Sequence, residues 1–369
     1  MKFVKNEIVL CAAFVLAVLS AFAVHPDVKY AGYIDYRTLS ILLMLMITMA
    51  GFQKLSVFKQ IGELLVRKMS SIRGVVMVLI MLCFFSAMLI TNDVALITFV
   101  PFSVVTLSIS ERKDLYIMVI VLETVAANLG SMLTPLGNPQ NLYLYSLSGM
   151  SLGDFIMLML PYSVVALILL IIMGIITVKS DPVRLKERNE YNRTTQDKIM
   201  IGMYLFTFLV SILVVSRVLE YIVGLIIVAA VVMLLDRKVL RSPDYSLLFT
   251  FIFLFIFIGN IKRIPALSNL LQQLVRVNEV GVSIILSQFI SNVPTAILCS
   301  GFTKAIPKLI VGTNLGGLGT LIASMASLIS FKQYSNIEGS DTRKYILVFT
   351  WVNLLFLAVM IVINVVAGL

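Results

Sequence analysis

Apolar stretches long enough to cross a lipid bilayer recur along the chain, separated by short polar or charged loops. A helix needs about 20 predominantly apolar residues to cross the hydrocarbon. Uninterrupted spans are predicted at about 8–24, 36–52, 154–178, 199–215, 221–235, 246–259 and 345–366. Amphipathic stretches are predicted at 54–73 and 260–279. The pattern is typical of an all-α polytopic membrane protein.

Four further apolar runs are interrupted by polar residues. Thr91-Asn92-Asp93 interrupts the run 75–110, and Ser291-Asn292-Val293-Pro294-Thr295 interrupts the run 281–304. The runs 115–147 and 309–330 contain Asn128-Leu129-Gly130 and Asn314-Leu315-Gly316. A helix broken at membrane depth is tolerated only where its freed backbone groups are buried in protein or line a wet cavity. Paired breaks in two halves of a chain therefore indicate the binding site of a transporter.

The two Asn-Leu-Gly segments align without a gap over NLGSMLTPLGN (128–138) and NLGGLGTLIAS (314–324). The alignment places Thr134 on Thr320, Gly137 on Ala323 and Asn138 on Ser324. The wider order of span, amphipathic stretch, interrupted run, broken helix and span occurs at 35–178 and again at 246–369. We therefore expect two repeats, preceded by a span and outer loop (1–34) and separated by a connector and two linking spans (179–245).

Loop charge predicts how these segments cross the membrane. Basic residues lie on both sides of the run 75–110, and cytoplasmic loops are the ones enriched in Lys and Arg. That run should then enter and return on one side, as a re-entrant hairpin with residues 91–93 at its tip. With the N-terminus in the cytoplasm, the two repeats are inverted relative to each other. One segment departs from the charge rule: 260–279, predicted outside, carries Lys262, Arg263 and Arg276.

The composition excludes several other functional classes. Of the 369 residues 60% are hydrophobic and 13% charged, whereas a soluble domain has about 25% charged residues. The net charge of +10 is explained by basic loops, without a nucleic-acid partner. The chain has a single histidine, and its three cysteines lie in apolar runs, so no His/Cys metal cluster is expected. No HExxH or phosphate-binding GxxxxGK[ST] motif occurs. The only GxSxG match, GMSLG (149–153), lies in a loop between two apolar runs and not between a strand and a helix, so it is no serine elbow. Neither an enzyme nor a built-in ATPase is therefore expected.

The tips and breaks supply the candidate binding groups. Small polar side chains, free backbone N–H groups and helix N-termini can bind an anion, and unwound carbonyl groups suit Na⁺. The candidate substrate-binding residues are Thr91, Asn92, Asp93, Asn138, Ser291, Asn292, Thr295 and Ser324. The candidate ion-binding residues are Asp93, Asn128, Gly130, Thr134, Gly137, Asn314, Gly316 and Thr320. The alternative is that these residues only cap and pack helices, as small and hydroxyl residues often do in membranes.

Two acidic residues lie within apolar runs, where an unpaired charge is costly. Asp93 suits a proton- or Na⁺-carrying role, or it could cap the helix that returns from the tip. Its counterpart in the second repeat is Val293. Glu123 lies about one and a half turns before Asn128, where it could join the ion path or pair with a Lys or Arg.

These motifs resemble those of the ion transporter superfamily, which includes arsenite permeases, D-type Na⁺/H⁺ antiporters, citrate transporters and Na⁺-coupled dicarboxylate transporters. The resemblance rests on residues 91–93, on NLGSMLTPLGNPQN (128–141), on SNVPT (291–295) and on GTNLGGLGTLIASMAS (312–327). It implies a scaffold that dimerises and a transport domain that moves like an elevator. The dicarboxylate branch carries Ser-Asn-Thr at both tips, a pattern from which this chain departs.

The expected function is ion-coupled secondary transport of a small anionic solute, a carboxylate or an inorganic oxyanion, across the cell membrane. Na⁺ or H⁺ is the expected coupling ion, and no other cofactor is expected. The alternatives on the same fold are a Na⁺/H⁺ antiporter and an arsenite or antimonite efflux permease. A passive channel is a further alternative.

Overall fold

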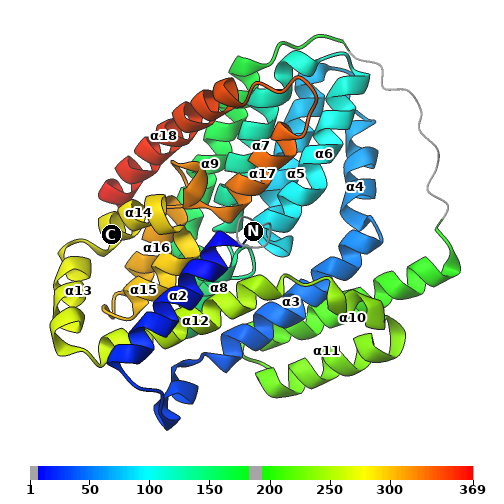
Figure 1. Ribbon diagram of the computed structural model, residues 1–369. Coiled ribbons are helices and arrows are strands. Elements are labelled where there is room, and N and C mark those ends of the chain that lie inside the picture. Colours follow the sequence, from blue (N-terminus) through cyan, green and yellow to red (C-terminus); the bar gives the residue numbers. More distant parts are fainter. Residues whose placement is uncertain (1–6, 183–192, 369) are drawn as a thin grey trace.

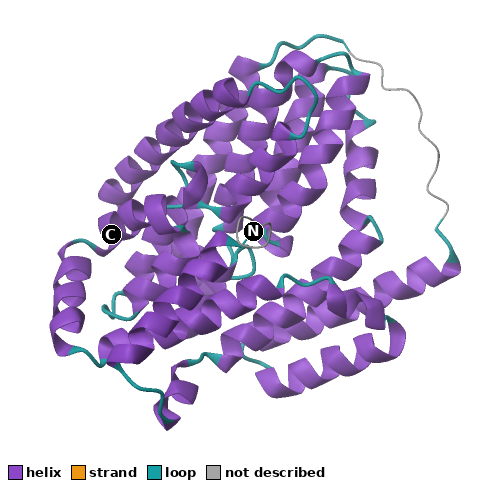
Figure 2. Cartoon of the chain, viewed as in Figure 1, coloured by secondary structure: helices purple, strands orange, loops and turns teal. Residues whose placement is uncertain are grey.

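The computed structural model describes residues 7–182 and 193–368, so part of the predicted connector 179–198 lies outside the described residues. Within these ranges all regular elements are helical, apart from one antiparallel bridge between Ser71 and Pro182 (Figures 1 and 2). Eight of the described helices are long and apolar enough to cross a membrane. The chain is therefore a polytopic all-α membrane protein, as the hydrophobic pattern predicts.

The longer helices, in chain order, are α2 (Ile8–Ala23), α3 (Tyr36–Lys54), α4 (Val57–Val66), α5 (Ile72–Ile90), α6 (Asn92–Ile109), α7 (Tyr116–Ser131), α8 (Pro139–Ser148), α9 (Leu152–Thr177), α10 (Thr195–Val215), α11 (Tyr221–Leu235), α12 (Tyr245–Lys262), α13 (Pro265–Val277), α14 (Glu279–Ile290), α15 (Asn292–Ser300), α16 (Ile306–Leu315), α17 (Met325–Ser335) and α18 (Thr342–Ala367).

Helices α2, α3, α10, α11 and α12 form one group, which occupies the lower part of Figure 1. Thr48 of α3 donates a hydrogen bond to Thr207 of α10 (3.0 Å). At the end of α3, Lys54 forms a 2.6 Å ion pair with Asp236, which follows α11. On the other side of the group, α12 packs along α2, and Asn260 donates to Ser20 (3.0 Å).

Helices α5 to α9 and α14 to α18 form the second group. Helix α7 is central in it and contacts α5, α6, α9, α17 and α18. Figure 1 shows α17 beside α6 and α7, with α18 along the outer side near α9. Large side chains such as Phe84, Phe99, Phe155 and Phe349 are fully buried between these helices. Burial of such apolar area stabilises helix contacts mainly by close packing, because lipid is itself apolar.

The breaks fall where the sequence predicts them. A single residue separates the two helices of each interrupted run: Thr91 (φ 70°, ψ 148°) and Ser291 (φ 71°, ψ 158°). The outer ends of the helices differ by a few residues from the predicted limits. Helix α5 begins at Ile72 because the side chain of Ser71 caps it, and Asn278 caps α14 in the same way. Polar caps, and not the first apolar residue, set where these helices start.

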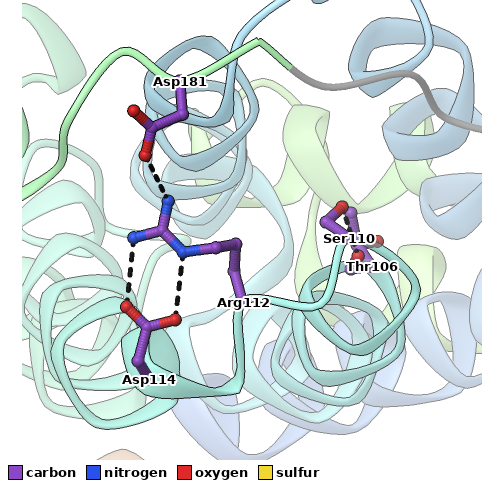
Figure 3. Close-up of polar contacts among 5 residues, drawn as sticks. All are labelled: Thr106, Ser110, Arg112, Asp114 and Asp181. Atoms are coloured by element: carbon purple, nitrogen blue, oxygen red, sulfur yellow. Dashed lines mark hydrogen bonds and ion pairs between the residues drawn. The ribbon is translucent and has the colours of Figure 1, made fainter.

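An ion-pair cluster joins three loops at one end of the second group (Figure 3). Arg112, which follows α6, donates two hydrogen bonds to Asp114 (3.0 Å each) and one to Asp181 (2.9 Å). Nearby, Arg73 donates to the carbonyl of Val178 at the end of α9 (2.8 Å). The cluster therefore links the end of α6, the start of α7 and the segment after α9.

Replacing Arg112 with Gln should lower the apparent melting temperature at neutral pH by about 1–2 °C, because the cluster is largely exposed. The hydrogen bonds from Arg112 lower the pKa of Asp114. A lowered folded-state pKa stabilises fully above the unfolded value of about 3.9 and is lost as pH falls through the folded value. The difference between the two proteins should thus be smaller at a pH below about 3.9 than at neutral pH, in thermal unfolding scans of purified protein. Arg276→Gln, in an exposed position on α13, is the matched control and should change nothing at either pH.

Candidate functional site

The first tip lies directly against the first helix break. Asn92 donates through its side-chain amide to Asn128 Oδ1 (3.1 Å) and through its backbone N–H to the carbonyl of Gly137 (3.0 Å). Asn128 belongs to the last turns of α7, and Gly137 precedes α8. The tip is therefore fixed to both sides of the break, and the freed backbone groups there have protein partners.

The two helix breaks are bonded to each other in a reciprocal way. Asn128 accepts from the hydroxyl of Ser324 (3.0 Å) and donates to Ser327 (3.2 Å). Asn314 accepts from Asn138 (3.4 Å) and donates to Asn141 (2.5 Å). The ungapped alignment pairs Asn138 with Ser324 and, extended by three residues, Asn141 with Ser327. Asn128 and Asn314, which the alignment also pairs, thus each contact the equivalent two positions of the opposite break.

We call the buried set Asn92, Asn128, Asn138, Asn141, Asn314, Ser324 and Ser327 the amide centre. All of its side chains are at most 5% exposed, so their mutual hydrogen bonds take the place of water. The sequence-based site includes all of these residues except Asn141 and Ser327. Both lie in the quoted motifs, and extending the alignment by one helical turn would have found them.

Thr134 and Thr320 occupy matching places at the edge of the breaks. The hydroxyl of Thr134 donates to the carbonyl of Met88, and that of Thr320 to the carbonyl of Gln288 (3.1 Å). Met88 and Gln288 each precede a tip by three residues. Both threonines therefore fasten a break to a hairpin helix through their hydroxyl groups, and the backbone carbonyl of Thr134 also accepts from the side-chain amide of Asn141 in the amide centre (3.3 Å). Thr320 is exposed, in contrast to the lining position expected for it.

Two glycines allow the helices around the breaks to approach closely. A Cβ atom at Gly130 would lie 2.0 Å from the carbonyl oxygen of Phe84 in α5. One at Gly316 would lie 2.6 Å from the Ser287 hydroxyl in α14. These two positions are also equivalent in the alignment. Gly137 is similarly close to Ser131, so all three expected ion-site glycines act in packing in this structure.

The second tip has longer polar contacts than the first. The hydroxyl of Ser291 lies 3.4 Å from Asn292 Oδ1 and 3.5 Å from the carbonyl oxygen of Ala323. Thr295 donates back to the carbonyl of Ser291 within the same helix (2.8 Å). Ala323 is the aligned counterpart of Gly137, so both tips face the same position of a break. Ser291, Asn292 and Thr295 are all buried.

A cavity of about 210 Å³ lies between the two helix groups. Thr91, Asp93 and Asn138 line it from the second group, and residues of α3 and the start of α12 line it from the first. Among the described residues, no hydrogen bond or ion pair involves the carboxylate of Asp93. The helix-capping alternative for this residue is not seen: Thr91 holds the N-cap position of α6, and the backbone N–H of Asp93 bonds to Asn92 Oδ1 (3.0 Å).

Glu123 is fully buried in α7, away from this cavity. The hydroxyl of Ser103 in α6 donates to one oxygen of its carboxyl group, and the other oxygen has no partner. In the part of the chain that the structure describes, no Lys or Arg pairs with it. The expected alternative of a basic partner is therefore not observed.

Comparison with known proteins identifies the family of this chain. Residues 4–308 match the family model described as citrate transporter. The chain belongs to that family. It is 30% identical over 321 residues to "Inner membrane protein YbiR" of Escherichia coli, covering 85% of this chain and 84% of that one. It is 32% identical over 301 residues to "Uncharacterized transporter MJ0456" of Methanocaldococcus jannaschii, covering 81% of each. The protein is accordingly a membrane transporter.

Replacing Gly130 with Ala should destabilise the protein by about 1–3 kcal/mol, because the added methyl group collides with backbone that cannot move aside easily. Thermal unfolding of the detergent-purified protein measures this change. Gly202→Ala in α10 is the matched control, since a Cβ there meets nothing within 4 Å. The control should be neutral or slightly stabilising, as Ala is the better helix former. Equal effects of both substitutions would contradict the close packing of α7 on α5.

Proposed function

We propose that this protein is an ion-coupled secondary active transporter for a small anionic solute, a carboxylate or an inorganic oxyanion. The observation that carries the proposal is the reciprocal bonding of the two helix breaks in the amide centre. Polar groups at this depth are expensive to keep in a membrane protein and usually mark a substrate or ion path. The family description as citrate transporter supports a carboxylate as cargo.

The contacts support two inverted repeats as the basis of alternating access. The order α3 to α9 recurs as α12 to α18, and the tips, threonines and glycines form matching contacts in both. In this proposal α5–α6 and α14–α15 are re-entrant hairpins that enter from opposite faces. Repeats of this kind can form two mirror-related states, one open to each side of the membrane.

The two helix groups suit the parts of an elevator-type carrier. The first group, α2, α3, α10, α11 and α12, would be the scaffold. The second group, which holds the tips and breaks, would move as the transport domain. The amphipathic helices α4 and α13 connect the groups and would lie at the membrane surface. We further propose that the scaffold dimerises, and that the protein lies in the cell membrane with its N-terminus in the cytoplasm.

Asp93 is the proposed binding residue for the coupling ion, Na⁺ or H⁺. Its carboxylate reaches the cavity and has no protein partner in the described structure. A bound cation would balance this charge and allow an anion to occupy the adjacent amide and hydroxyl groups of Thr91 and Asn138. A cation and an anion that bind together would cross as a less charged load, which reduces the penalty of transfer through lipid.

A second candidate is supported by the charge of the same cavity. Its described lining contains Asp93 and Asp244 and no Lys or Arg. Such a lining favours cations, as in a Na⁺/H⁺ antiporter. The related efflux of arsenite or antimonite also remains compatible, because the neutral hydroxide of either element carries no charge to repel.

Counterflow in proteoliposomes tests the transport proposal. Liposomes loaded with unlabelled citrate, phosphate, sulfate or arsenite should accumulate the labelled form of the true cargo, and a Na⁺ or pH gradient should increase that uptake. Saturation at high concentration distinguishes a carrier from a passive channel. If none of these solutes exchanges and a pH gradient drives Na⁺ flux instead, the antiporter alternative holds.

Asp93→Asn and Asn292→Ala should each reduce counterflow at least tenfold, because one removes the ion-binding charge and the other a buried amide at the second tip. Asp341→Asn, at the cap of α18, and Asn353→Ala, a buried amide in the middle of α18, are the matched controls. Both controls should retain activity in proportion to the amount of folded protein. Undiminished transport in Asp93→Asn and Asn292→Ala would show that the tips do not bind the cargo.

A further inference from the structure

The cavity beside Asp93 has a second carboxylate on the opposite helix group. Asp244 precedes α12 and lines the same cavity as Asp93, which lies in the first turn of α6. Asp244 is exposed, whereas Asp93 is partly buried. Asp244 therefore lies at the outer part of the cavity and Asp93 at the inner part. The two acids belong to different helix groups.

No basic side chain is among the residues that line this cavity in the described structure. The basic residues that lie closest in sequence to the lining residues do not reach the cavity. Lys54 is held by Asp236 at 2.6 Å, and the exposed Arg241 lies three residues before Asp244 without reaching the lining. The remaining polar lining consists of neutral groups such as Thr91 and Asn138. The charged groups that line this cavity are thus its two carboxylates, and Lys59 lines a separate cavity that shares Gln53 and Ile97 with it.

The opposite end of the scaffold lacks this arrangement. Asp35-Tyr36 begins α3 as Asp244-Tyr245 begins α12, and both aspartates cap their helices by accepting from the backbone N–H three residues on (3.0 and 3.3 Å). Asp35 does not line the cavity. The counterpart of Asp93 in the second repeat is Val293. Capping alone therefore explains Asp35, but it does not explain why a second acid faces Asp93 on one side only.

We propose that Asp244 and Asp93 make this cavity a cation-selective vestibule, with Asp244 as the selecting residue at its mouth. The inference rests on the proposed carrier function and specifies how its coupling cation enters. Asp244 raises the local concentration of cations and lowers that of anions, and Asp93 binds the cation that arrives. An anionic cargo enters through this face only after a cation has bound, or as a complex with one.

The rate at which a charged reagent modifies a cysteine in the cavity measures this selectivity, and no transported substrate is needed. Ile97 lines the cavity one turn beyond Asp93 and is 41% exposed, so Ile97→Cys is the reporter. The purified full-length protein in nonionic detergent is treated with a trimethylammonium or a sulfonate methanethiosulfonate. The parent chain with its own three cysteines provides the background rate. The ratio of the two rates reports the electrostatic potential at position 97.

The cationic reagent should react faster than the anionic one at low salt, and added salt should reduce the difference. Adding Asp244→Asn should lower the ratio of the rates about threefold or more, because one unit charge near the reporter is removed while Asn still caps α12. Asp35→Asn, with the same chemistry at the far end of α3, should leave the ratio unchanged.

An unchanged ratio in Asp244→Asn, an equal fall in Asp35→Asn, or a fall in Asp93→Asn alone would each overturn the selecting role of Asp244. A reporter that reacts with neither reagent would overturn the vestibule itself. None of these outcomes depends on counterflow, so failure of this inference is distinguishable from failure of the transport proposal. Size-exclusion profiles of each variant verify that the folded protein is being compared.

Discussion

The structure depends on satisfying polar groups where lipid offers no partners. Each helix break frees backbone N–H and carbonyl groups, and each free group would destabilise the protein by several kcal/mol in hydrocarbon. The chain meets this constraint with side-chain amides: Asn141 donates to carbonyl groups of the first break, and Gln288 donates to the carbonyls of Gly316 and Leu318 in the second. Asn128 and Asn314 each bond to the opposite break, and the tip residue Asn92 bonds to the carbonyl of Gly137. The side-chain bonds between the breaks then hold the two segments together at one buried centre.

This pairing also explains why small residues cluster around the breaks. The backbone of α7 must approach α5 closely enough for the first tip to reach Asn128, and only glycine fits at position 130. The same reasoning applies to Gly316 against α14. Thr134 and Thr320 then fix the spacing by bonding to a carbonyl one turn before each tip. The close packing at the glycines and the polar contacts at the breaks thus depend on each other. The same residues both hold the helices together and form the candidate site.

Much of this arrangement could be predicted from the sequence because its signals are local. Apolar length gives the spans, and the polar interruptions at 91–93 and 291–295 give the tips. The alignment of 128–138 with 314–324 gives the matching of the breaks, although stopping it there omits Asn141 and Ser327. The sequence could not show that Thr320 is exposed or that Gly137 packs on Ser131, since both depend on how the chain bends after a break. Asp244 could not be found either, because only folding brings the start of α12 to the cavity of Asp93.

The departures from symmetry are as informative as the symmetry. Two identical repeats would give both faces the same energy and the same selectivity, so a carrier built from them would have no preferred face for its ion. In this chain the amide centre is shared almost evenly, whereas the charges are not: Asp93 has only Val293 as its counterpart, and a second acid approaches it only from α12. In the carrier that we propose, the near-equal parts would interchange between states at little difference in free energy. The unequal charges would then determine at which face a cation is taken up or released, which is the step that would couple an ion gradient to movement of the cargo.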